Sequence, residues 1–327
     1  SKRGLEVQSL SLFERVFWRF NVKTKKGIFG KLALLFVAVA WGSSMVVIKG
    51  STDYLPAGTL LAMRFTIASI ALAIVNNKKL KQLNKEYIKS GIIIGLCLFC
   101  AYFTQTVGVM LEMPGKSHFL SSAYCVFVPF LGWLVLRKRP DKFNIIAAIM
   151  CAVGIILVSV AGGFSISFGD SISILSSVFW ASQIIAIAKW GEDKDPVLIT
   201  MLQFMVCAVL AWVYTLTLED VSSIQWHSSA ITGVLYLGLI CSGLCFLLQT
   251  IAQKTEDPTS VSIILSFENI FGIVFGVIFF NEQLTVRSVT GFTLMFLAII
   301  IAETKLSFLF KKKEGVAEVE TEAQTQL

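Results

Sequence analysis

The chain has 327 residues, of which 55% are hydrophobic and 15% are charged, and its mean hydropathy is +0.76. Soluble domains carry about 25% charged residues, so this composition excludes a soluble globular protein and predicts an all-α integral membrane protein. The net charge of +7 belongs to short segments between long apolar runs. Such segments face a membrane surface, and we expect no nucleic-acid partner.

Residues 1–31 form a basic segment in which eight Lys and Arg side chains outnumber two acidic ones. No small-residue cleavage site follows, so we expect no signal peptide. Phe13 and Phe17 recur at helical spacing beside Arg15 and Arg19, which favours an amphipathic helix on the cytoplasmic face of the bilayer. A disordered tail is the alternative.

Ten apolar runs follow, and each is long enough to cross the hydrocarbon core, which takes about 17–25 helical residues. They are residues 32–49, 58–75, 88–109, 116–136, 143–161, 170–188, 197–216, 230–252, 259–280 and 286–303. The connections between them are short, so we expect little soluble domain. Residues 304–327 form a polar tail, acidic after Lys313, that we expect to be cytoplasmic and disordered.

The direction of the runs follows from the distribution of positive charge. With the N-terminus inside, 24 of the 28 Lys and Arg residues lie on the inner side, and positive loops stay cytoplasmic. This predicts a multi-pass protein of the plasma membrane with both termini cytoplasmic. The halves 32–161 and 170–303 hold five runs each, an odd number, so they cross the membrane in opposite directions. We therefore predict two inverted five-helix repeats, which place a solute site near the midplane where they meet.

One carboxylate, Glu268, lies near the middle of the ninth run, which has no other charged residue. A charge at that depth costs a few kcal/mol. We therefore expect Glu268 to face a polar cavity inside the protein, where it contacts a cationic or amine-bearing solute or exchanges a coupling proton. The alternative is a neutral acid that is hydrogen-bonded to a neighbouring helix.

Other polar and aromatic residues at mid-depth are candidates for substrate binding, with interhelical hydrogen bonding as the alternative for each. They are Tyr102, Gln105, Tyr124, Trp180, Gln183, Gln249 and Asn269. Trp41 and Trp180 occupy comparable places near the start of each half and are candidates for aromatic walls around a ring or a cationic group, with lipid-facing or packing tryptophan as an equal alternative. Arg64 is about six residues into the second run, so we expect it to snorkel to the surface, with binding of an anionic substrate or pairing with a carboxylate as the alternatives.

The remaining chemistry-bearing residues carry no recognisable site. All seven cysteines lie within apolar runs, and the two histidines, His118 and His227, are far apart. We therefore expect no disulfide framework, no metal site and no cofactor. The sequence has no GxxxxGK[ST] phosphate loop, so ATP-driven pumping has no support. We do not expect an enzyme.

Three groups of short motifs are distributed over the two halves, two in the first and one in the second. They are Trp41–Ser44 with Lys49, Pro56 and Arg64–Phe65; Ser117–Leu120, Val128–Phe130 and Leu136–Pro140; and Ser266–Asn269 and Asn281–Leu284 with Gly291. Together they resemble the EamA family of the drug/metabolite transporter superfamily, in its ten-helix type with two EamA repeats. The likeness covers about residues 32–303 and implies a central cavity and alternating access. Asn269 stands where the family often has proline, so we expect the ninth helix to lack a kink there.

These observations predict a secondary active transporter that moves a small metabolite, such as an amino acid or an amine, by alternating access. We expect an exporter or exchanger, surrounded by membrane lipids, with protons as a candidate coupling ion and a monomer or homodimer as the functional unit. A channel or a lipid-handling protein without alternating access is the alternative.

Overall fold

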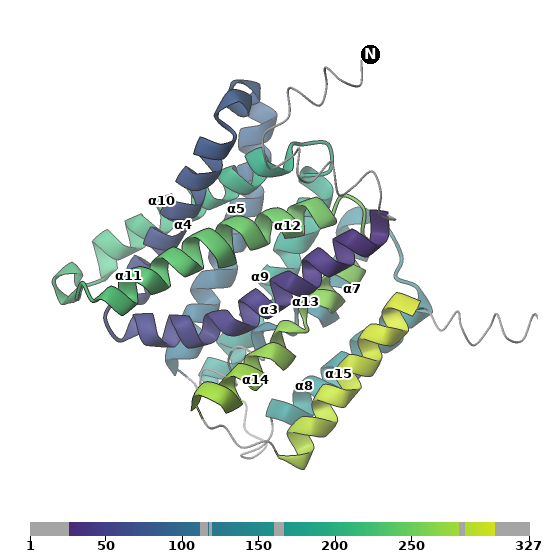
Figure 1. Ribbon diagram of the computed structural model, residues 1–327. Helices are drawn as coiled ribbons and strands as arrows, with labels where there is room; N and C mark the ends of the chain where they lie inside the picture. The colour runs from purple at the N-terminus through teal and green to yellow at the C-terminus, as the bar shows by residue number, and fades with distance from the viewer. Residues whose placement is uncertain (1–25, 112–116, 118–119, 160–166, 281–284, 305–327) are drawn as a thin grey trace, which may run out of the picture.

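The computed structural model describes residues 26–111, 117, 120–159, 167–280 and 285–304, and these are helical apart from short turns. Residues 1–25, which hold the predicted amphipathic helix, the Asn281–Leu284 motif and the tail after residue 304 lie outside the described residues, whereas residues 26–31 of the basic segment belong to the first helix. The helices (Figure 1) are α3 (Lys26–Thr52), α4 (Ala57–Val75), η1 (Asn77–Gln82), α5 (Lys85–Leu111), α7 (Tyr124–Leu136), α8 (Lys142–Ser159), α9 (Phe168–Trp190), α10 (Pro196–Leu218), η2 (Val221–Ser223), α11 (Ser228–Leu235), η3 (Tyr236–Leu244), α12 (Cys245–Ala252), α13 (Pro258–Leu265), α14 (Glu268–Phe280) and α15 (Val286–Thr304).

Seven helical segments of the described chain are long and apolar enough to cross a membrane. They are Ile28–Thr52, Ala57–Val75, Lys85–Leu111, Phe168–Trp190, Pro196–Leu218, Ser228–Ala252 and Pro258–Phe279. Three shorter apolar helices, Tyr124–Leu136, Lys142–Gly154 and Val289–Ala298, overlap the other predicted runs. The chain is therefore a multi-pass membrane protein, and the prediction of ten crossings depends on these three shorter helices.

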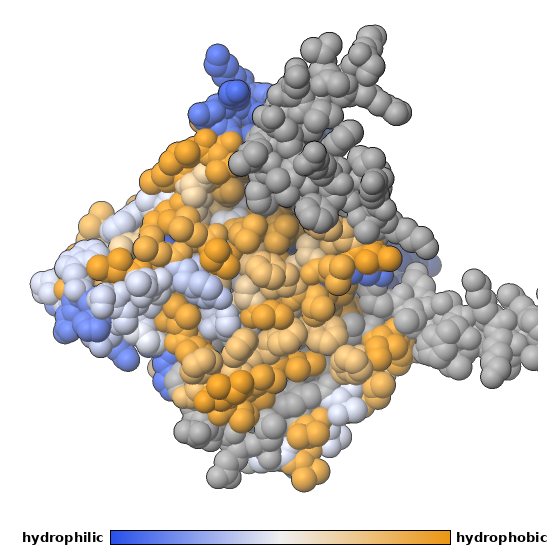
Figure 2. Space-filling view, viewed as in Figure 1, coloured by the Kyte–Doolittle hydropathy of each residue, from blue (hydrophilic) through white to orange (hydrophobic). Residues whose placement is uncertain are grey.

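The outer surface of the bundle is apolar between two hydrophilic ends. Ile74, Leu134 and Val209 are each more than 60% exposed, as lipid-facing side chains are. Figure 2 shows hydrophobic side chains over most of the visible face, with hydrophilic ones gathered at the top, where η1 lies, and at the left, where α11 begins. We call these the η1 end and the η2 end.

Each end joins segments that are distant in the chain. At the η1 end, Lys254 Nζ donates to the carbonyl of Lys194, and Lys189 Nζ donates to the carbonyl of Val135. At the η2 end, the backbone N–H of Gln225 donates to the carbonyl of Tyr54. The long helices therefore run between the η1 end and the η2 end, and their central turns lie at mid-depth in the bundle.

Close helix packing depends on glycine. A Cβ on Gly91 of α5 would lie 2.5 Å from the Leu202 Cβ of α10, and one on Gly95 would lie 2.6 Å from the Val206 Cβ. Small residues at this spacing let backbones approach closely within a membrane. Elsewhere α3 packs against α14, and α8 packs against α15 at one edge of the bundle (Figure 1).

A carboxylate from one helix caps the beginning of another at the η2 end. Glu219 follows α10, and its carboxylate accepts hydrogen bonds from the backbone N–H groups of Gly58 and Thr59 at 2.6 and 2.9 Å and from Thr59 Oγ1 at 3.1 Å. The α4 N-cap residue, Pro56, makes no side-chain cap hydrogen bond. Glu219 therefore satisfies N–H groups that helix geometry leaves unpaired and places a negative charge at the positive end of the α4 dipole.

Replacing Glu219 with glutamine is expected to lower the free energy of unfolding by about 1–2 kcal/mol, because the amide has one acceptor oxygen and no charge. Thermal unfolding in detergent measures the change as a lower midpoint. Asp53→Asn is the matched control, since Asp53 is an exposed acid at the same end. Equal midpoints for the two variants would contradict the capping role.

Candidate functional site

A cavity of about 440 Å³ lies in the middle of the bundle. Its lining comes from α3, α4, α5, α9, α12, the α13–α14 junction and the start of α7, and it includes Trp41, Ser44, Arg64, Tyr102, Gln105, Ser121, Tyr124, Trp180, Gln249 and Glu268. The exposed members of the lining, Lys49, Thr52 and Met110, all belong to the η2 end. The cavity therefore opens toward the η2 end, and Trp41 lies roughly 16 Å deep at about 1.5 Å per residue.

Aromatic rings form the deep wall of the cavity. Trp41 and Trp180 have ring centroids 6.1 Å apart, and Tyr102 meets Trp180 edge to face at 4.8 Å. Phe246 packs against all three rings. The two tryptophans were predicted from their places in the two halves, and the structure brings them together at one wall.

Arg64 lies at this wall, and the prediction that it snorkels to the surface was wrong. Its side chain is 2% exposed; Nε donates to Ser242 Oγ at 3.0 Å and Nη2 donates to the Tyr102 hydroxyl at 3.2 Å. The guanidinium carbon lies 4.7 Å from the Tyr102 ring centroid, a cation–π contact. Hydrogen bonds and this ring replace water around the charge, so the side chain remains inside.

A π-helix holds both Trp41 and Arg64 in place. The eighth apolar run was predicted as one continuous helix, but its centre, η3, has π geometry between α11 and α12. The carbonyl of Cys241 in η3 accepts a hydrogen bond from Trp41 Nε1 at 2.8 Å, and Ser242 of η3 accepts from Arg64. Short π segments are frequent at functional sites because their widened turn redirects backbone groups.

Glu268 occupies the wall of the cavity at the junction between α13 and α14. It is 6% exposed, and its Oε1 accepts hydrogen bonds from Ser122 Oγ and the Tyr124 hydroxyl, both at 3.1 Å. No hydrogen bond from the described residues ends on Oε2. Two hydrogen bonds thus hold Oε1 in place, whereas Oε2 accepts no hydrogen bond from the described residues at the cavity wall.

The ninth run is interrupted at Ser266 and Phe267, so the expectation of an unkinked helix was wrong. Ser266 Oγ donates to the carbonyls of Ser262 and Ile263, and Asn269 Nδ2 donates to the carbonyl of Ser266. Such side-chain bonds compete with the helical ladder and bend it. Serine and asparagine therefore interrupt this helix, as proline interrupts other helices by lacking a backbone N–H donor.

A second interruption faces the first. Ser122 and Ala123 form a turn before α7, which begins at Tyr124. Because Ser122 and Tyr124 both bond Glu268, the turn before α7 and the turn before α14 lie side by side at the cavity. Both half-helices begin at this point.

Six of the eight predicted substrate-binding residues line the cavity: Tyr102, Gln105, Tyr124, Trp180, Gln249 and Glu268. Gln183 and Asn269 do not. Gln183 lies beneath the cavity, where its Nε2 donates to Gln203 and its Oε1 accepts from Gln249. Asn269 bonds the backbone of its own helix break. Ser44 and Ser121 also line the cavity. Sequence reasoning did not select Ser44, although it lies one helical turn after Trp41 and its hydroxyl donates to the Trp41 carbonyl.

The route from the cavity to the η1 end is blocked by buried side chains. Below Gln249, the chain of glutamines continues through Gln183 to Gln203, and all three are at most 1% exposed. Gln253, nearer the η1 end, donates through Nε2 to the carbonyl of Ile184 at 3.0 Å. These contacts join α9, α10 and α12 across the floor of the cavity.

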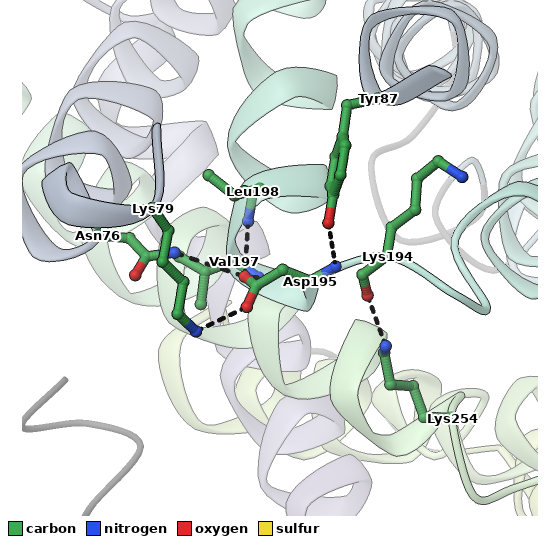
Figure 3. Close-up of polar contacts among 8 residues, drawn as sticks. All are labelled: Asn76, Lys79, Tyr87, Lys194, Asp195, Val197, Leu198 and Lys254. Atoms are coloured by element: carbon green, nitrogen blue, oxygen red, sulfur yellow. Dashed lines mark hydrogen bonds and ion pairs between the residues drawn. The ribbon is translucent and has the colours of Figure 1, made fainter. Parts of the chain in front are cut away.

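Asp195 organises the η1 end beyond this floor (Figure 3). Its carboxylate accepts from the backbone N–H groups of Val197 and Leu198, which caps α10, and pairs with Lys79 Nζ at 2.8 Å. Its own N–H donates to the Tyr87 hydroxyl at 2.9 Å.

Next to Asp195, Lys254 donates to the carbonyl of Lys194, as Figure 3 shows. Burial lowers the pKa of the Lys254 ammonium group, while the nearby Asp195 and Asp193 carboxylates oppose this shift. Hydrogen bonds and an ion pair thus join the η1 segment, the α9–α10 turn and the α12–α13 turn.

The described residues contain no cluster of three His, Cys, Asp or Glu side chains that could hold a metal ion. All seven cysteines are free. The acidic and basic side chains at mid-depth in the cavity lining are Glu268 and Arg64.

A multi-pass helical protein with a charged cavity at mid-depth, open toward one end, has the architecture of a membrane transporter. Comparison with known proteins narrows this class, because residues 28–160 and 167–304 each match the EamA-like transporter family. The chain belongs to that family. The family and several of its relatives are named as transporters.

Three relatives illustrate the likeness. The chain is 27% identical to an uncharacterized transporter of Archaeoglobus fulgidus over 86% of this chain and 88% of that protein. It is 26% identical to the uncharacterized transporter YvbV of Bacillus subtilis over 84% and 91% of the two chains, and 24% identical to protein PecM of Dickeya dadantii over 85% and 93%. A protein of known crystal structure shares the fold, with a TM-score of 0.70 and 16% identity over 86% of this chain and 98% of that one.

Proposed function

We propose that this protein is a secondary active transporter that moves a small, amine-bearing metabolite across the plasma membrane by alternating access, as an exporter or exchanger. The observation that carries the proposal is the Glu268 carboxylate at the wall of the central cavity, with Oε1 held by Ser122 and Tyr124. An ionised carboxylate at this depth of a membrane costs free energy, so intramembrane acids mark solute or proton pathways. Its second oxygen is placed to accept from an ammonium group or to carry a coupling proton.

Two inverted five-helix repeats account for the geometry around Glu268. In the described parts of the matched segments 28–160 and 167–304, a turn precedes α7 in the first and α14 in the second, and these two turns meet at the cavity. Inverted repeats with broken helices at the midplane are a recurring design of secondary transporters. The three shorter apolar helices supply the remaining crossings of a ten-helix arrangement.

Alternating access is supported by the unequal ends of the cavity. It reaches the η2 end, whereas the glutamine floor and the Asp195 contacts close the η1 end. Lysines 78, 79, 81, 85 and 89 all lie at the η1 end, and positive loops favour the cytoplasm. We therefore assign the η1 end and both termini to the cytoplasm, so that the structure is a state open away from it.

The alternative is a channel or a lipid-handling protein without alternating access. A channel needs a polar path along the whole membrane, but the floor beneath Gln249 is buried and is bonded across three helices. Counterflow separates these functions, because only a carrier exchanges labelled for unlabelled solute with saturation.

The test begins with the wild-type protein, purified and screened by thermal shift against amino acids, amines, nucleosides and vitamins, since a bound ligand raises the unfolding midpoint. The strongest ligand is then used, radiolabelled, for counterflow in sealed liposomes. Glu268→Gln is expected to lower the initial rate at least about tenfold, because the amide keeps the shape of the side chain but not its charge.

Glu86→Gln is the matched control, since Glu86 is an exposed acid at the start of α5 and lies outside the cavity. It should transport as the wild type does. Unchanged rate and unchanged pH dependence in Glu268→Gln would remove Glu268 from the mechanism, and an absence of counterflow in the wild type would favour a channel.

A further inference from the structure

The guanidinium of Arg64 has N–H donors for which the described residues supply no acceptor. An arginine carries five N–H groups, and the described residues accept from two of them, one on Nε and one on Nη2. No carboxylate among these residues lies within ion-pair distance of Arg64. A buried charge without a counter-charge is costly, yet this side chain is 2% exposed and lines the cavity.

The contacts of Arg64 fix its orientation. Ser242 holds Nε, the Tyr102 hydroxyl holds Nη2, and the ring of Tyr102 lies against the guanidinium. Both N–H groups of Nη1 and one of Nη2 have no acceptor among the described residues. Two terminal nitrogens of one planar fork are the geometry that binds a carboxylate in bidentate fashion.

The cavity lining holds one basic and one acidic side chain at mid-depth, Arg64 and Glu268. A solute that bears a single negative and a single positive charge complements both. A phosphate monoester, with a charge of about −1.5 to −2, would leave an excess negative charge beside Glu268. The aromatic rings of Trp41, Tyr102 and Trp180, which contact one another in the lining of the same cavity, suit an apolar or aromatic body.

We propose that Arg64 binds the carboxylate of the transported solute while Glu268 binds its amino group, so that the substrate class is a small zwitterion with an apolar body. This inference rests on the proposed transport function and adds Arg64 as the residue that determines specificity. Arg64 belongs to the first EamA-like segment and Glu268 to the second. One solute therefore contacts both segments, and its binding depends on how they are placed relative to each other.

The first test uses the wild-type protein, so it does not depend on how a variant folds. The twenty standard amino acids are screened by thermal shift, and each one that raises the midpoint is compared with its carboxamide and its decarboxylated amine. Removal of the carboxylate from the ligand is expected to weaken binding about 10- to 100-fold, the usual effect of losing hydrogen bonds to a charged group.

The second test repeats the comparison with Arg64→Gln and Arg64→Lys. Arg64→Gln is expected to weaken binding of the amino acid by the same 10- to 100-fold and to leave binding of the amine within about threefold of wild type, because the two losses concern one contact. Arg64→Lys should recover part of the affinity. Arg139→Gln, in an exposed residue at the η1 end, is the matched control and should bind both ligands normally.

The outcomes separate this inference from the function on which it rests. If the amine binds the wild type as tightly as the amino acid does, or if only phosphate esters bind, the role of Arg64 is overturned. Transport of the amine that still depends on Glu268 would leave the proposed function intact. Absence of counterflow for every ligand that binds would instead remove the transport function.

Discussion

Replacing Gly42 with alanine is expected to lower the free energy of unfolding by about 1–3 kcal/mol and to reduce transport at the same time. A Cβ at this position of α3 would lie 2.6 Å from the Phe271 Cβ and 2.8 Å from both the carbonyl oxygen of Glu268 and the backbone nitrogen of Gly272. Two of these three atoms belong to the backbone of α14, so no rotamer change can relieve the clash. The first turn of α14 must move away, and Glu268 moves with it.

Gly50→Ala is the matched control, because Gly50 lies on the same helix and a Cβ there meets nothing within 4 Å. Alanine is the better helix former, so this variant should be stabilised by about 0.5–1 kcal/mol. Thermal unfolding and counterflow in liposomes measure both effects. A normal midpoint and a normal transport rate in Gly42→Ala would show that α3 and α14 are not held together as closely as the structure has them.

Much of the candidate site could be predicted because it depends on chemistry that stands out in an apolar sequence. Glu268 is the only charge in its run, and Tyr102, Trp180 and Gln249 are polar or aromatic at mid-depth. The hydropathy pattern alone therefore predicts which helices contribute to the site and at what depth in the membrane. The depth of a residue in the membrane does not determine which neighbours its side chain contacts. Gln183 is only three residues from Trp180, but its side chain bonds Gln203 and Gln249 beneath the cavity.

Arg64 could not be placed from sequence, because the partners that keep it inside are distant along the chain. Ser242 is separated from it by 178 residues and Tyr102 by 38. Ser242 also belongs to the π-helix η3, and a hydropathy pattern does not distinguish a π-helical register from an α-helical one. The position of an arginine near a helix end indicates snorkelling only when no such partners exist.

The break in the ninth helix was missed for a different reason. Proline is the familiar signal for a helix break, and its absence at Asn269 led to the prediction of an unkinked helix. The sequence nevertheless contained another signal, since Ser262, Ser266 and Asn269 are spaced so that each side chain can reach a backbone carbonyl one turn earlier. Serine and asparagine at helical spacing within a membrane run therefore predict an interruption where proline is missing.

Closure of the η1 end is the other feature with a large expected effect, because one residue carries several contacts at once. Asp195 caps α10 through two backbone N–H groups and forms an ion pair with Lys79 in which the two side chains are only 15% and 21% exposed. An N-cap contributes about 1 kcal/mol, and a partly buried, hydrogen-bonded pair about as much again. A transporter that alternates must break this set of contacts whenever the η1 end opens, so they bias the equilibrium toward the closed state.

Replacing Asp195 with alanine is therefore expected to shift this equilibrium by about 2 kcal/mol, roughly 30-fold, toward an open η1 end. Hydrogen–deuterium exchange in lipid nanodiscs should become faster by a similar factor in residues 196–200 and 253–258, while the η2 end keeps its protection. Asp195→Asn, which retains a capping oxygen but loses the charge, should give part of the effect. Asp193→Asn is the matched control, because Asp193 is 81% exposed and its ion pair within the described residues is with its neighbour Lys194, so its loss should leave exchange unchanged. If Asp195→Ala exchanges no faster than Asp193→Asn, the η1 end is closed by the buried glutamines beneath the cavity and not by Asp195.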